Sequence, residues 1–183
     1  TFIKSLEIEI EVYVSNSFYI PRIAQLTQRT NQFNLTTKRY TQNDIKMFIE
    51  SDNYDVLSVK LVDRFGDYGI IGTAILAYDK FKAYIDTFLI SCRALGRRVE
   101  DVLLAECIKM AKFKGKKEIY GIYYPTNKNV HVKDFYKSKG FITLQNGEHY
   151  IGKYNIDFSH SYVLPECYKS ITSEIDLLNT IEE

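Results

Sequence analysis

Three arginines and a glycine stand together in the segment SCRALGRRVE, directly before a stretch with helical periodicity. The glycine is Gly96, and the arginines are Arg93, Arg97 and Arg98. The first turn of a helix leaves backbone N–H groups without partners, and the helix dipole adds partial positive charge there. Glycine lets a ligand approach the backbone closely. The segment therefore predicts a site for a phosphate group.

Two further side chains near this junction could do chemistry. Asp86 lies in the strand-like segment IDTFLIS, where it is either a general base or substrate-orienting group or a polar residue on the solvent face of the strand. Cys92 is either a nucleophile, if Arg93 and the helix N-terminus stabilise its thiolate, or a small buried residue that closes the strand. The sequence leaves both pairs of alternatives open.

The elements that position these residues follow from hydrophobic spacing. Residues 6–14 alternate and predict a half-buried strand, Pro21 begins a helix that ends near Asn31, and Thr41 with Asp44 resembles the capping box of a second helix ending before residue 53. The polar block 31–37 between the two helices either lines a cleft or caps helix ends.

The rest of the chain predicts an antiparallel meander followed by alternating helices and strands. The predicted strands are 56–62, 68–78, 83–91 and 118–125, the long helix runs from Gly96 to Gly115, and a short helix spans 132–140. A closing hairpin turns at Asn146-Gly147, and a surface-packed tail from residue 159 carries a possible helix over 172–181. This order is an α+β plan.

The junction resembles the acyl-CoA fingerprint [R/Q]-x-x-G-x-[G/A] of the GCN5-related N-acetyltransferase (GNAT) superfamily, which here spans Arg93 to Arg98. The resemblance implies that backbone amides bind the pyrophosphate of coenzyme A. Arg98 stands where the fingerprint has Gly or Ala, and its side chain could itself contact phosphate. The cofactor-binding residues implied are Arg93, Leu95, Gly96, Arg97, Arg98 and Val99.

A second block, NKNVHVKDFYKSKGF, resembles the GNAT segment in which an Asn precedes a Tyr by seven positions and GF follows. It implies that Tyr136 donates a proton to the departing thiolate and that Asn129 helps to hold the cofactor arm. The alternative for Tyr136 is plain amphipathic packing. The resemblance further implies a mixed, mostly antiparallel sheet flanked by helices and splayed open beside residues 92–100, a gap that would admit a pantetheine arm.

Most of the chain is similar to the C-terminal region of FkbH-like proteins, on the blocks SLEIEIEV, IPRIAQLTQRTNQFNLTTKRYT, DRFGDYGIIG, IDTFLISCRALGRRVED and YYPTNKN. Those proteins fuse a haloacid-dehalogenase-type phosphatase domain to a GNAT-like domain. The likeness implies one GNAT-like domain over 1–183, with the tail at 159–183, excised from a longer protein with an upstream phosphatase-type domain. It also implies an acyl carrier protein as partner and the loading of glyceryl-type acyl units for methoxymalonyl-type polyketide extenders.

Two functions follow from these resemblances. The first is an acyltransferase that uses acyl-CoA or an acyl-carrier thioester without a metal. The second is a non-catalytic module that binds carrier-borne phosphopantetheine for the phosphatase-type domain. Because 24 basic residues face 23 acidic ones, we expect no nucleic-acid partner, and the short apolar runs predict no membrane span. The three cysteines are widely spaced and predict neither disulfides nor zinc, which is typical of a cytoplasmic protein.

Overall fold

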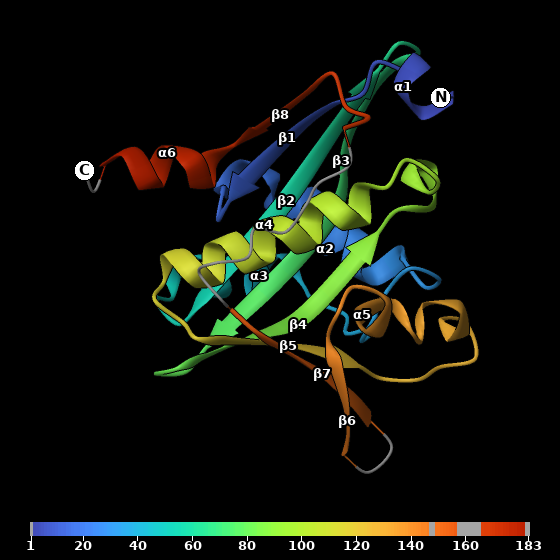
Figure 1. Cartoon of the computed structure of the whole chain (residues 1–183). Helices are drawn as coiled ribbons and strands as arrows, with labels where there is room; N and C mark the ends of the chain where they lie inside the picture. The colour runs from blue at the N-terminus through green and yellow to red at the C-terminus, as the bar shows by residue number, and fades with distance from the viewer. Residues whose placement is uncertain (1, 147–148, 157–165, 182–183) are drawn as a thin grey trace.

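One mixed sheet organises the computed structural model, which describes residues 2–146, 149–156 and 166–181. Over those residues the sheet has eight strands in the order β6-β7-β5-β4-β3-β2-β1-β8 (Figure 1). Helix α4 (Val99–Phe113) crosses one face, and helices α2 (Ile20–Arg29) and α3 (Gln42–Glu50) lie on the other (Figure 1). The predicted α+β plan is confirmed.

The N-terminal elements match the predicted strand and two helices. They are α1 (Phe2–Ser5), β1 (Glu9–Val14), the short 3-10 turn η1 (Ser17–Tyr19), α2 and α3. The capping box before α3 is confirmed, since Asp44 N donates to Thr41 Oγ1 (3.1 Å) and Thr41 N donates to Asp44 Oδ2 (2.8 Å). This reciprocal pair fixes where the polar stretch between the helices ends.

The predicted meander is also confirmed, as β2 (Tyr54–Asp63), β3 (Gly66–Tyr78) and β4 (Lys82–Ile90), which pair antiparallel. After β4 come the 3-10 turn η2 (Cys92–Ala94), α4 and β5 (Glu118–Tyr123). Because α4 carries the chain back across the sheet, β5 pairs parallel to β4.

The C-terminal part adds a 3-10 turn η3 (Val130–Val132), α5 (Phe135–Ser138), β6 (Ile142–Asn146), β7 (His149–Asn155), β8 (Ser170–Ser173) and α6 (Glu174–Ile181). The predicted hairpin is confirmed as β6 and β7, although Gly147 in its turn lies outside the described residues. The predicted final helix is α6. The tail is described only over residues 166–181. It does more than pack on the surface, because β8 pairs parallel with β1 and extends the sheet.

The main hydrophobic cluster lies between α4 and the sheet, and two smaller clusters lie under α2 and α3. Helix α4 is buried along most of its length, including the carboxylate of Glu106. That carboxylate accepts hydrogen bonds from Lys109 Nζ (2.8 Å) and Ser173 Oγ (2.6 Å), so α4 is tied to the C-terminal strand. Burial of this kind is stable only when the charge is paired, and here it fixes α4, whose first turn follows the predicted phosphate loop.

Candidate functional site

Strands β4 and β5 run side by side for only four residue pairs, from Lys82 with Glu118 to Ile85 with Gly121. Beyond Ile85 and Gly121 they diverge, while β4 continues to Ile90. The predicted splay of the sheet beside residues 92–100 is therefore confirmed.

The gap between the diverging strands is filled by the chain's own segment 33–35. Leu35 N donates to Phe88 O (3.0 Å), and Ile90 N donates to Phe33 O (3.0 Å). On the other side, Tyr124 N donates to Leu35 O (2.9 Å). In this conformation the segment therefore occupies part of the gap and uses Phe88 O and Ile90 N of β4. That the gap admits a pantetheine arm stays a prediction. We call these three residues the bridging segment.

Asn129 holds the bridging segment in place. Its side chain is fully buried, and Nδ2 donates to Asn34 O (2.9 Å) and to Tyr124 O (3.0 Å). Its Oδ1 accepts from Thr126 N (2.8 Å) and from the hydroxyl of Tyr123 (3.2 Å). In this conformation the amide of Asn129 binds the protein's own backbone. Its role in holding a cofactor arm stays a prediction.

Tyr136 lies at the point where β4 and β5 separate. A methyl group added to Gly121 would stand 2.5 Å from Cζ of Tyr136, so the ring rests directly on the last β5 residue paired with β4. The ring also packs edge-on against Phe88 (centroids 6.4 Å). The hydroxyl is buried and has no hydrogen-bond partner among the described residues. Burial raises the pKa of Tyr136 well above its ordinary value, so the hydroxyl keeps its proton at neutral pH.

Asp86 projects from β4 on the side of the sheet that α3 covers. Ile75 pairs with Thr87 and Leu76 with Ile85, so Asp86 is the extra residue of a β-bulge, a feature that redirects side chains. Its carboxylate accepts hydrogen bonds from the side chains of Lys38 (2.5 Å), Tyr40 (2.6 Å) and Thr87 (2.9 Å).

The opposite placement of Asp86 and Tyr136 follows from their neighbours. Tyr40, which binds Asp86, packs edge-on against Phe48 of α3 (5.0 Å), whereas Tyr136 belongs to the core cluster that contains α4. Burial and the Asp86 carboxylate together raise the pKa of Tyr40, so this hydroxyl also stays protonated. The candidate base and the candidate acid therefore lie on opposite faces of the sheet.

The predicted phosphate loop adopts the conformations that its glycine pattern requires. Gly96 has φ +84°, and Arg98 takes the left-handed conformation (φ +59°) directly before α4. Glycine, one of the two residues that the fingerprint has at that position, would carry no strain there. Leu95 packs against the core, and Val99 is buried within it.

Two of the three loop arginines are paired inside the protein. Arg98 Nε donates to Asp101 Oδ2 (3.0 Å), and Arg97 Nε donates to Asp63 Oδ2 (3.4 Å). Arg93 instead lies over the ring of Tyr68 (5.4 Å) and is exposed. Of the loop arginines, Arg93 has the guanidinium best placed to meet a ligand.

A pocket of about 460 Å³ opens beside the end of β4, between that strand and α2. Its lining includes Arg22 and Arg29 of α2 together with Arg93 and the exposed Cys92. The sequence analysis missed Arg22 and Arg29. Their spacing of seven residues, two helical turns, places both on one face of α2, but only the fold brings that face to the end of β4.

The described residues hold no cluster of three or more His, Cys, Asp or Glu side chains suited to a metal ion. Among the helices in the described ranges, none has the length and apolar character needed to cross a bilayer.

Comparison with solved structures identifies the fold. No family model and no curated protein sequence matches the chain. The ribosomal-protein-S18-alanine N-acetyltransferase of Escherichia coli matches with a TM-score of 0.61 at 12% identity, over 85% of this chain and 99% of that one. PaiA N-acetyltransferase from Thermoplasma acidophilum, in complex with coenzyme A, gives 0.59 at 17% identity, over 80% and 98%. A GNAT-family acetyltransferase from Streptococcus pneumoniae gives 0.60 at 15% identity, over 81% and 99%. The chain therefore has the GNAT fold.

Proposed function

We propose that this GNAT-fold domain is an acyltransferase that takes the acyl group of a pantetheine thioester, borne by coenzyme A or by a carrier protein. The observation that carries the proposal is the hydroxyl of Tyr136, buried and without a partner at the point where β4 and β5 separate. A buried hydroxyl without a hydrogen-bond partner lowers the stability of the fold. Such a hydroxyl is retained where a bound ligand supplies the missing partner.

The residues on the two sides of the gap divide the proton transfers between them. An acyl thioester bound in the gap supplies the carbonyl carbon that the acceptor attacks. Asp86 accepts the proton that the acceptor loses, directly or through water, and Tyr136 donates its own proton to the sulfur as the C–S bond breaks. Tyr136 carries its proton at neutral pH, as a proton donor must, although burial raises its pKa and weakens it as an acid until the ligand adds its own polar contacts. Solvent then restores the phenol.

Binding of the pantetheine arm requires the bridging segment to leave the edge of β4. The backbone groups of Phe88 and Ile90 that an extended arm would pair with are the ones that Leu35 and Phe33 now use. Exchange of one set of backbone hydrogen bonds for another has a small net cost, about 1 kcal/mol for each bond. The neighbour PaiA was solved with coenzyme A, which supports the choice of thioester donor.

The test is thioester turnover by the wild type and by Tyr136→Phe, with acetyl-, malonyl- and glyceryl-CoA and the same acyl groups on a carrier protein. Release of free thiol reports the reaction. We expect Tyr136→Phe to lower kcat at least about a hundredfold with little change in KM. Tyr120→Phe is the matched control, because Tyr120 lies on β5 but bonds Glu118 (2.7 Å) away from the gap. Equal kcat in the wild type and Tyr136→Phe would remove Tyr136 from the mechanism.

The biosynthetic setting belongs to the same proposal. On its likeness to FkbH-like proteins, the domain follows a phosphatase-type domain in a longer cytoplasmic protein and serves an acyl carrier protein in the loading of glyceryl-type units for polyketide extenders. Pull-down of the full-length protein with its carrier protein, followed by mass measurement of the loaded carrier, tests this setting separately from the chemistry.

A second function is favoured by the bridging segment itself. If the segment never leaves β4, the domain binds the carrier and its phosphopantetheine at the surface without acyl transfer. In that case the wild type and Tyr136→Phe turn over no thioester, yet deletion of the domain still prevents loading of the carrier by the phosphatase-type domain.

A further inference from the structure

Three arginines converge on the pocket between α2 and the end of β4. We call it the arginine pocket and define it by Arg22, Arg29 and Arg93 around an apolar floor of Leu26, Phe33 and Ile90. Within the described part of the chain, none of the three arginines makes an ion pair, in contrast to Arg97 and Arg98.

The three positive charges act on one another. Burial lowers the pKa of Arg22, and the charges of Arg93 and Arg29 lower it further. Like charges gathered in one pocket cost free energy unless an anion joins them. The three arginines are therefore stable side by side only when an anion lies between their guanidinium groups.

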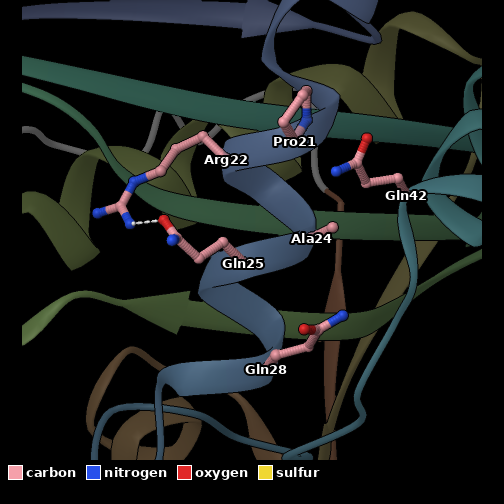
Figure 2. Close-up of a pocket in the computed structure, with 6 residues that line it drawn as sticks. All are labelled: Pro21, Arg22, Ala24, Gln25, Gln28 and Gln42. Atoms are coloured by element: carbon pink, nitrogen blue, oxygen red, sulfur yellow. Dashed lines mark hydrogen bonds between the residues drawn. The ribbon is translucent and has the colours of Figure 1, made fainter.

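Two of the guanidinium groups are held in position before any ligand arrives. Arg22 Nε donates to Ile70 O (3.1 Å) and Nη1 donates to Gln25 Oε1 (2.6 Å), and the second of these bonds is drawn in Figure 2. Arg93 stacks on Tyr68. Fixed planar forks bind carboxylates and phosphates with less loss of entropy than free side chains.

The neighbouring surface of α2 shows that this concentration of charge is local. A second depression of about 430 Å³ is lined by Gln25, Gln28 and Gln42, and Arg22 is the single cation among the residues that line it. Figure 2 shows the guanidinium of Arg22 pointing away from Gln42, toward Gln25. The positive charge therefore belongs to the arginine pocket.

We propose that the arginine pocket binds a small organic anion with two or more negative charges, such as a polycarboxylate or a phosphate ester, and that this anion is part of the acyl acceptor. The assignment to the acceptor rests on the proposed function. It follows from position, because the pocket lies against α2, on the face of the sheet that also bears Asp86, whereas Tyr136 lies on the face of α4. An acceptor anchored there approaches the gap from the side of the candidate base.

The binding test is calorimetric titration of the protein with citrate at low salt. We expect one site, weakened at least about tenfold in Arg29→Gln and in Arg93→Gln, because each substitution removes one charged hydrogen-bond donor. Arg64→Gln is the matched control, since Arg64 is exposed in the turn between β2 and β3, away from the pocket. No citrate binding, or binding that the two pocket substitutions leave unchanged, would overturn the proposal.

The source of the anion is tested by repeating the titration with coenzyme A at saturation. Unchanged citrate affinity supports an acceptor site. Competition would show that the pocket takes a phosphate of the donor instead, and the acceptor assignment would fall. If coenzyme A does not bind at all, the proposed function fails for a coenzyme A donor and rests on the carrier-borne thioester alone, while the citrate titration still decides whether the pocket binds anions.

Discussion

The side-chain amide of Asn129 donates to the backbone carbonyl of Asn34 at 2.9 Å, across 95 residues of sequence. This bond joins the loop after β5 to the bridging segment and holds that segment between β4 and β5. The same amide is the one that the GNAT resemblance assigns to the cofactor arm. One side chain thus links the closed state of the gap to the site that the gap would form when open.

Asn129→Ala should lower the free energy of unfolding by about 3 kcal/mol, because several buried partners of the amide would lose their hydrogen bonds. Urea denaturation measures this loss, and amide exchange should accelerate at residues 33–37. Asn127→Ala is the control, since Asn127 is exposed in the same loop. Equal stability of the two variants would show that the hydrogen bonds of Asn129 contribute little to the free energy of unfolding.

Asn34→Ala should tighten thioester binding if the bridging segment must move aside. The side chain of Asn34 accepts from Thr37 N (2.9 Å) and donates to Thr30 O (3.1 Å), so its loss loosens the segment. Each 1.4 kcal/mol removed from the closed state raises the apparent affinity for coenzyme A by about tenfold until the open state dominates.

The control for that experiment is Thr41→Ala, which removes the cap of α3 and costs about 1 kcal/mol without touching the segment. Calorimetry with coenzyme A compares the two variants. Weaker binding by Asn34→Ala than by the wild type would contradict a segment that competes with the ligand.

Tyr136→Phe should be as stable as the wild type or more stable by about 1 kcal/mol, because it removes a buried hydroxyl that has no partner. Tyr123→Phe should instead lose about 1 kcal/mol, since the hydroxyl of Tyr123 donates to Asn129 Oδ1 (3.2 Å). Thermal unfolding of both variants tests the pair. A clear loss of stability in Tyr136→Phe would mean that its hydroxyl has a partner in solution.

Asp86→Asn should lower kcat for transfer to an acceptor about a hundredfold, because the amide cannot take the acceptor's proton. Binding of coenzyme A should not change, and the hydrogen bonds with Tyr40 and Thr87 allow the shape of the site to persist. Asp52→Asn, in the exposed turn after α3, is the control. Full activity in Asp86→Asn would leave water as the base.

Glu100→Gln should stabilise the protein at pH 7. Burial, with a further contribution from Asp101, raises the pKa of Glu100 above its ordinary 4.5, so the folded state keeps this proton to a higher pH than the unfolded state. Stability therefore falls as the pH rises from 4.5 through the raised value, and Gln removes that loss. Unfolding curves should show that Glu100→Gln has a higher free energy of unfolding than the wild type at pH 7 and an equal one at pH 4.

Glu118→Gln should change the stability at pH 7 in the opposite direction from Glu100→Gln, and it serves as the comparison. The bond from Lys153 lowers the pKa of Glu118, so its contribution to stability is present above 4.5 and is lost as the pH falls through the lowered value. Glu118→Gln should therefore lose stability at pH 7. Changes of the same sign in the two variants would contradict the burial argument for Glu100.

Elements with strong periodicity or capping were predictable from the sequence, and elements defined by distant partners were not. The alternation at 6–14 and the box at Thr41 and Asp44 are local patterns. The box is confirmed, and the strand is confirmed over Glu9–Val14. Strand β8 is four residues of sequence SITS, too short to show a period, and only its pairing with β1 makes it a strand.

The same reason limits the prediction of the site. The polar block 31–37 is predicted to line a cleft or to cap helix ends, and Asn31 and Gln32 do line the arginine pocket. Its central residues also pair with β4 and with the start of the loop after β5, a long-range pairing that residue spacing does not reveal. The arginine pocket unites α2 with the end of β4, which no local pattern could show. Tyr136 was placed by its motif, while its missing hydrogen-bond partner is a property of the packed core alone.

The order of the chain gives the bridging segment a role during synthesis. Residues 33–35 precede β4, whereas β5 follows it after the whole of α4. An unpaired strand edge invites pairing with other chains. When β4 has emerged and β5 has not, the segment can already cover the backbone of Phe88 to Ile90, the part of that edge that β5 never reaches. The nascent domain thereby exposes less aggregation-prone edge while its second half is still being made.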